Sequence, residues 1–122
     1  MRFMDEEKVM RKLIKDLRTG LYVAMIMYLL SKYGTLHGYR IRVLIQEVSG
    51  GYLNPSESTI YESLKMMSKL GLVESFWAET GYGPPRKYYK LTDFGMRIWG
   101  RLRGELRGFI KIIREVVGDL GD

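Results

Sequence analysis

The middle of the chain carries side chains of the kinds that proteins use to read DNA. Ile60, Leu64 and Met67 recur at the spacing of the buried stripe of a helix, and we expect this helix to run from a cap at Ser56 to about Leu70. Its opposite face carries hydroxyls and lysines, which bond to phosphates and to base edges. That face consists of Ser58, Thr59, Tyr61, Glu62, Lys65 and Lys69. These residue types favour a helix that reads the major groove, although an ordinary solvated face explains this helix alone equally well.

A second group of polar residues follows a stretch that cannot form regular structure. Residues 80–85 hold two glycines and two prolines between two segments that favour strands, so we expect a hairpin with a stiff tip. Arg86 and Lys87 come directly after this tip, and tyrosines are interleaved with the cations. A basic hairpin of this kind suits a wing that grips the DNA backbone. We expect Tyr88 to be exposed beside the cations and Tyr89 to pack on the core.

Catalytic chemistry has little support in the sequence. The chain has no cysteine and a single histidine, His37, so thiol nucleophiles and a protein-only metal site are not expected. His37 stands at a helix start beside Gly38, where a structural polar contact is the simpler interpretation. The carboxylates lack a neighbouring nucleophile or a phosphate-binding loop. We therefore expect a binding protein rather than an enzyme, with no catalytic residues, no metal and no cofactor.

Length and charge agree with one domain that binds a polyanion. The chain has 122 residues, which is enough for a single core, and its formal net charge is +6. The longest apolar run, residues 21–30, is about half of what a membrane-spanning helix needs. No cleavage pattern of small residues follows it. These observations predict a cytoplasmic protein with no membrane partner.

Two helices are expected in the first third of the chain. Apolar residues recur at helical spacing between Asp5 and Leu17, and the segment from Leu21 to Tyr33 is apolar on almost every side, as a buried helix would be. We expect Thr19-Gly20 to separate these helices and Gly34 to end the second.

The last thirty residues predict a long helix with a narrow apolar seam. Thr92 is placed to cap it, and its apolar residues follow each other at intervals of three or four, as in a coiled coil. The seam consists of Ile98, Leu102, Leu106, Phe109, Ile113, Val116 and Leu120. We expect it to join two copies of the chain. Three glycines on another face, Gly100, Gly104 and Gly108, suggest either close approach of another helix, such as the N-terminal one, or an exposed strip without a packing role.

The order of the expected elements is that of a winged helix with added terminal helices. A third helix is expected from about Leu36, with Thr35 as its cap, to Val48, ahead of the DNA-reading helix and the hairpin. The fold class is therefore mainly α with a small β-hairpin. We expect an N-terminal helical extension over residues 1–18, a winged helix-turn-helix domain over 19–92 and a dimerisation helix over 93–122.

Four ordered motifs resemble the PadR family of transcriptional regulators. They are Leu36-His37-Gly38-Tyr39, Asn54-Pro55-Ser56 followed by Ser58-Thr59-Ile60-Tyr61, Leu70-Gly71-Leu72-Val73, and Pro85 to Thr92 with Gly95. The resemblance covers roughly residues 19–120. The chain departs from the family at Glu62, where proline often follows the tyrosine. A carboxylate there would either accept from a cytosine amino group or weaken binding.

The resemblance implies a homodimer that binds a double-stranded DNA operator and usually represses a nearby gene. The family's helix positions fall on Ser56, Ser58, Thr59 and Tyr61, its helix-entry tyrosine on Tyr39, and its wing on Arg86, Lys87 and Tyr88. Some members respond to small aromatic or hydrophobic ligands, so an effector of that class is implied as well. An alternative from a different class is a winged-helix module that binds proteins, because fold does not dictate function.

Overall fold

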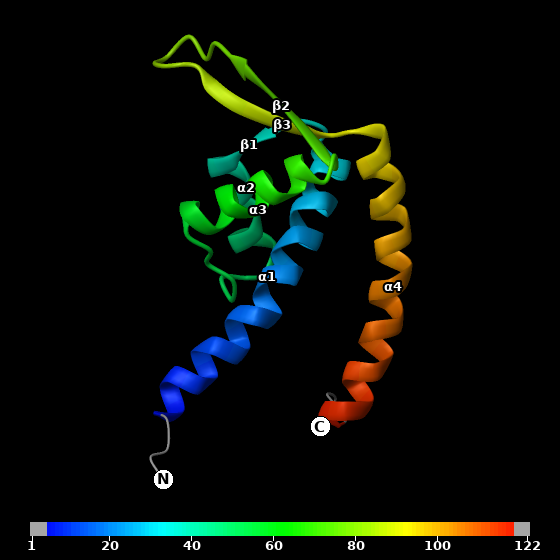
Figure 1. Ribbon diagram of the computed structural model, residues 1–122. Helices are drawn as coiled ribbons and strands as arrows, with labels where there is room; N and C mark the ends of the chain where they lie inside the picture. Colours follow the sequence, from blue (N-terminus) through cyan, green and yellow to red (C-terminus); the bar gives the residue numbers. More distant parts are fainter. Residues whose placement is uncertain (1–4, 119–122) are drawn as a thin grey trace.

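The computed structural model describes residues 5–118, which form four helices and three short strands (Figure 1). In chain order these elements are α1 (Glu6–Tyr33), β1 (Leu36–His37), α2 (Gly38–Val48), α3 (Glu57–Lys69), β2 (Val73–Ala78), β3 (Arg86–Leu91) and α4 (Asp93–Val117). Helices α1, α2 and α3 pack around one apolar core, and the strands form an antiparallel sheet in the order β1-β3-β2. This architecture confirms the predicted winged helix. Within residues 5–118, no helix is long and apolar enough to cross a membrane.

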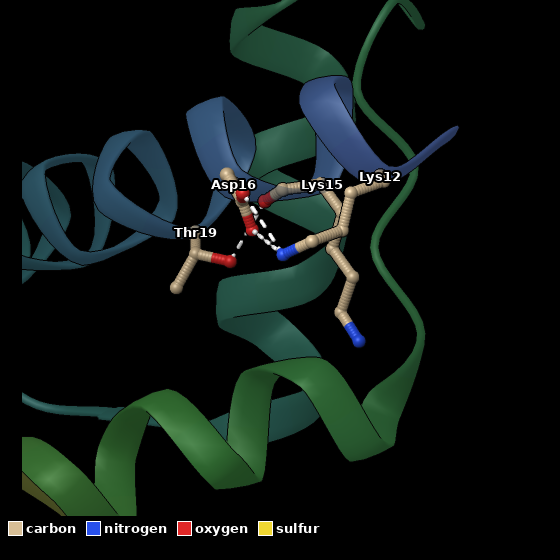
Figure 2. A network of polar contacts seen from close by, with 4 residues as sticks. All are labelled: Lys12, Lys15, Asp16 and Thr19. Atoms are coloured by element: carbon tan, nitrogen blue, oxygen red, sulfur yellow. Dashed lines mark hydrogen bonds and ion pairs between the residues drawn. The ribbon is translucent and has the colours of Figure 1, made fainter. Parts of the chain in front are cut away.

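The first third of the chain forms one helix, so the prediction of two helices separated at Thr19-Gly20 is wrong. The Thr19 hydroxyl donates to the backbone carbonyl of Lys15 at 2.8 Å, which the helix accommodates, and Gly20 stays helical (Figure 2). Glycine in a helix costs on the order of 1 kcal/mol relative to alanine, less than ending the helix and leaving its terminal backbone groups unpaired. The predicted end of the helix at Gly34, whose φ is +86°, is confirmed.

Only the second half of α1 is buried. Tyr22, Ile26 and Leu29 lie in the core. Of the apolar residues before them, only Ile14 is partly buried, whereas Leu13 and Leu17 are more than half accessible within the chain. The N-terminal half of α1 therefore projects from the globular part, as Figure 1 shows. Leu13 and Leu17 on its apolar side stay largely exposed within residues 5–118.

The predicted start of the third helix at Leu36, with Thr35 as the cap, is also wrong. Leu36 and His37 instead form β1, which pairs with Tyr89 and Tyr88 of β3. His37 is the N-cap of α2, because its Nδ1 accepts from the Arg40 backbone N–H at 3.2 Å. Pairing with the distant strand β3 decides this boundary. The expected structural polar contact of His37 is confirmed.

Helix α3 and the hairpin follow the sequence prediction closely. The Ser56 hydroxyl accepts from the Thr59 N–H at 3.1 Å and caps α3. Ile60, Leu64 and Met67 are each 0% exposed, as their spacing predicted. Tyr89 is buried at 5% exposure, which confirms its inward orientation. The exposed face of α3 therefore lies opposite a fully buried stripe.

The entry to α4 is held against the end of α3 by Thr92 and Gly95. The Thr92 hydroxyl donates to the Gly71 carbonyl at 2.6 Å and accepts from the Gly95 N–H at 2.9 Å, which confirms its role as N-cap. A Cβ on Gly95 would lie 2.1 Å from the Leu72 carbonyl oxygen, so this close approach requires glycine. These contacts fix the direction in which α4 leaves the wing.

Helix α4 packs on its own chain only along its first half. Trp99 is buried with its ring 6.4 Å from that of Tyr28, and Ile98, Leu102 and Leu106 are partly buried against the core. Phe109, Ile113 and Val116 are exposed, and the expected seam residue Leu120 lies outside the described residues. A Cβ on Gly100, Gly104 or Gly108 would meet nothing within 4 Å. The hypothesis that these glycines admit α1 is therefore wrong within one chain.

Candidate nucleic-acid interface

The exposed face of α3 lies between the start of α2 and the wing. Ser58, Tyr61 and Lys65 are exposed on this face, and Tyr39 is exposed at the start of α2. Gly38 allows the two helices to approach, since a Cβ there would lie 2.8 Å from the Tyr61 ring. His37, Tyr39, Tyr61, Arg86 and Lys87 line one shallow pocket. The fold therefore brings three of the sequence motifs together on one surface.

Two of the predicted site residues have a structural task as well. The Ser56 and Thr59 hydroxyls lie 3.0 Å apart at the first turn of α3, where Ser56 is the cap. Thr59 is half-buried on the side of α3 that faces α1, and Ser58 is exposed. The side chain of Ser58 is consequently better placed than that of Thr59 to reach a base edge.

The cations of the wing differ in how they are neutralised. Lys90 Nζ pairs with Glu74 at 3.3 Å, whereas Arg86 and Lys87 have no acidic partner within residues 5–118. Lys87 Nζ lies 6.0 Å from the Trp77 ring centre and 5.8 Å from that of Tyr89. Arg86 and Lys87 thus carry the unneutralised charge of β3.

Tyr88 is partly buried by other rings of the surface, so the expectation that it is exposed is wrong. Its ring stacks on Phe76 at 6.0 Å and meets the edge of His37 at 5.4 Å. Trp77, which is exposed, belongs to the same surface, although it was not among the predicted site residues. Its position opposite Lys87 in the β2–β3 register is a signal that the sequence could have given.

The Arg86 guanidinium contacts the His37 ring, but the ring cannot accept a hydrogen bond from Arg86 while it also caps α2. Arg86 Nη1 lies 2.9 Å from His37 Nε2, while His37 Nδ1 caps α2. A neutral imidazole has only one acceptor nitrogen, so when Nδ1 accepts from the α2 backbone, Nε2 carries a proton and cannot accept from Arg86. The guanidinium is therefore free to exchange this contact for a phosphate.

The surroundings of His37 keep it neutral. Burial lowers the pKa of His37 below its usual value, and the positive charges of Arg86 and Arg40 lower it further. The pKa of Tyr89 is raised by burial and by the neighbouring Tyr61. Near pH 7 the surface therefore carries the charges of Arg40, Arg86 and Lys87 without a charge on His37.

The other arginine of α2 has a structural role. Arg42 Nε donates to the Pro55 carbonyl at 3.0 Å and is partly buried, so it holds the loop before α3. Arg40, in contrast, is exposed near the wing. Of these two cations, only Arg40 lies on the candidate interface.

The sequence profile of the transcriptional regulator PadR-like family matches residues 26–101, which include α2, α3, the wing and the start of α4. The chain belongs to this family. The match contains every proposed DNA contact named so far. No curated protein sequence matches the chain.

Solved structures of transcriptional regulators, some of them PadR-like, share the fold. A transcriptional regulator from Clostridium thermocellum is 25% identical with a TM-score of 0.75, over 84% of this chain and 96% of that one. A PadR-like transcription factor from Bacteroides fragilis is 28% identical with a TM-score of 0.68, over 86% and 98%. PadR from Bacillus subtilis, solved in complex with operator DNA, is 30% identical with a TM-score of 0.58, over 67% of this chain and 45% of that chain.

Proposed function

We propose that this PadR-like regulator binds a palindromic DNA operator as a homodimer and represses a nearby gene. The observation that carries the proposal is the placement of α3, whose exposed polar face stands beside the unpaired cations Arg86 and Lys87. A helix in the major groove reads bases while flanking cations hold the phosphates. The complex of Bacillus subtilis PadR with operator DNA supports the same partner for this chain.

The proposed contacts divide by chemistry. Ser58, Tyr61 and Lys65 face the bases, because they lie on the exposed side of α3. The remaining contacts position the protein on the backbone, and they come from Tyr39, Ser56, Thr59, Arg86, Lys87 and Tyr88. The winged-helix module that binds proteins, the alternative from the sequence, gives no reason for cations on the wing.

The proposed dimer uses apolar surface that one chain leaves open. Phe109, Ile113 and Val116 continue the seam of α4 beyond the part packed on the core, and α1 exposes Leu13 and Leu17. Exposed apolar surface of this extent marks an interface in most proteins. A small hydrophobic or aromatic effector would act by binding one arrangement of the dimer more tightly than another. We place the protein in the cytoplasm, with chromosomal DNA.

Replacing both Arg86 and Lys87 by alanine should weaken binding to all DNA sequences nearly equally. Each lost phosphate contact should lower the slope of log affinity against log salt concentration by about one. The double variant loses two contacts in each protomer, so the slope for a bound dimer should fall by about four. Fluorescence titration of a labelled duplex at several salt concentrations measures this slope.

The Lys90→Ala variant is the matched control, because Lys90 lies on the same strand but is neutralised by Glu74. It should leave the slope nearly unchanged. If the double variant keeps the slope of the original protein, or if the control loses as much, the wing is not the phosphate-binding element.

A further inference from the structure

A groove on the other side of α3 is lined by cations of α1. It measures about 480 Å³ and lies between the N-terminal half of α1 and the first turns of α3. Arg11, Lys15 and Arg18 line the α1 wall at intervals of four and three residues, so they share one side of the helix. Ser56 and Thr59 line the opposite wall. The groove thus adjoins the N-terminal end of the proposed recognition helix.

These three cations have no acidic partner within residues 5–118. The one ion pair of α1 joins Lys12 Nζ to Asp16 at 3.1 Å, and Figure 2 shows the Lys15 ammonium pointing away from that pair. The Arg18 guanidinium lies 5.8 Å from the Tyr52 ring centre, and Arg11 Nε makes only a long contact, 3.4 Å, with the Glu7 carbonyl. Three positive charges therefore remain for an outside partner.

The position of these cations matches the shape of a duplex held by α3. The wing borders α3 at Tyr61, whereas α1 borders it at Thr59 and Glu62. In Figure 1 the N-terminal end of α3 points toward the side on which the wing tip and the start of α1 project. A major groove is bounded by two sugar–phosphate backbones, so a helix inside it has one backbone on each flank.

We propose that Arg11, Lys15 and Arg18 bind phosphates of the backbone on the flank of α3 away from the wing. This inference rests on the proposed DNA-binding function and adds a second set of phosphate contacts to those of the wing. Glu62 also lines the groove, so its carboxylate keeps phosphates at the rim, where the longer cationic side chains reach them. All three residues precede residue 26, where the family match begins, so the proposed contact lies outside the segment that matches the family.

The test is a triple variant, Arg11→Ala, Lys15→Ala and Arg18→Ala, titrated on the same duplex over a salt series. The slope of log affinity against log salt should fall by up to about six, one for each of three phosphate contacts in each of two protomers. Alanine favours helix, so α1 should persist, and circular dichroism checks this. In hydroxyl-radical footprints one flank of each half-site, the one next to α1, should lose protection while the flank next to the wing keeps it.

Two controls separate position from charge. The variant Arg101→Ala, Arg107→Ala and Lys111→Ala removes the same charge from exposed residues of α4 away from the seam, and Lys12→Ala removes a cation of α1 that is already paired. Both should keep the slope and the footprint. A triple variant with the slope of the α4 control would overturn the inference, whereas failure of the unaltered protein to bind DNA would overturn the proposed function itself.

Discussion

Replacing Phe109 and Ile113 by aspartate should give a folded monomer whose operator affinity falls about 100-fold or more, because a bound dimer gains avidity from two linked half-sites. Both side chains are about half exposed in one chain, at 52% and 54%, so the globular core does not depend on them. In a dimer each aspartate would be buried without a partner, which costs several kcal/mol. Sedimentation velocity at micromolar concentration measures the assembly.

The structure decides which seam residues suit this test. Leu106 packs partly on the core of its own chain, so a charged residue at this position could unfold the chain as well as dissociate the dimer. The matched control is Arg107→Ala with Lys111→Ala, which changes the net charge equally on another face of α4. The control should remain a dimer. A monomeric unaltered protein, or an aspartate variant that still dimerises, would contradict the role of the seam.

Inserting about five base pairs between two half-sites should reduce affinity to nearly that of a single half-site. Two recognition helices related by a twofold axis reach one face of the duplex only when the half-site centres are about 10 base pairs, or a multiple, apart. The Thr92 and Gly95 contacts fix α4 to the wing, so a dimer built on α4 holds the helices at a set distance. Half a turn would place the second site on the far side of the DNA.

A series of duplexes with insertions of zero to ten base pairs measures this dependence. Affinity should fall near five and recover in part near ten, where the two sites again share a face. A duplex with one scrambled half-site gives the reference affinity. Equal affinity at every spacing would show that the two α3 helices are not held in a rigid symmetric pair.

Local signals predicted those elements whose boundaries depend on nearby residues. Ser56 caps α3 and Thr92 caps α4 through hydrogen bonds to N–H groups three residues ahead, and such contacts can be read from sequence spacing. The alternation of strand residues also placed Tyr89 in the core. For the same reason the exposed face of α3 was identified correctly except for Thr59, which is half-buried.

Boundaries that depend on distant residues were missed. His37 caps α2 because Leu36 and His37 pair with β3, some fifty residues away. No residue near His37 in the sequence indicates that pairing. Thr19-Gly20 resembles a helix end, yet packing of the following residues holds α1 continuous.

In the candidate site, too, nearby residues predicted the types of side chain, whereas contacts with distant residues determine which side chains are exposed. Residue types indicated Arg86 and Lys87, but only the fold distinguishes Arg40, exposed near the wing, from Arg42, which holds the Pro55 carbonyl. The approach of the α1 cations to α3 depends on the continuation of α1 through Gly20, which sequence alone did not predict. The kinds of side chain in the candidate site could be predicted from the sequence, but their positions could not.

The most direct test of the central claim is selection of bound fragments from the source organism's own DNA with the purified, unaltered protein. A symmetric dimer that presents α3 to the major groove should enrich a recurrent inverted repeat. It should bind that repeat at least about a thousandfold more tightly than unrelated DNA at physiological salt. Enrichment of no common sequence, with equal affinity for selected and unrelated fragments, would contradict a sequence-specific regulator.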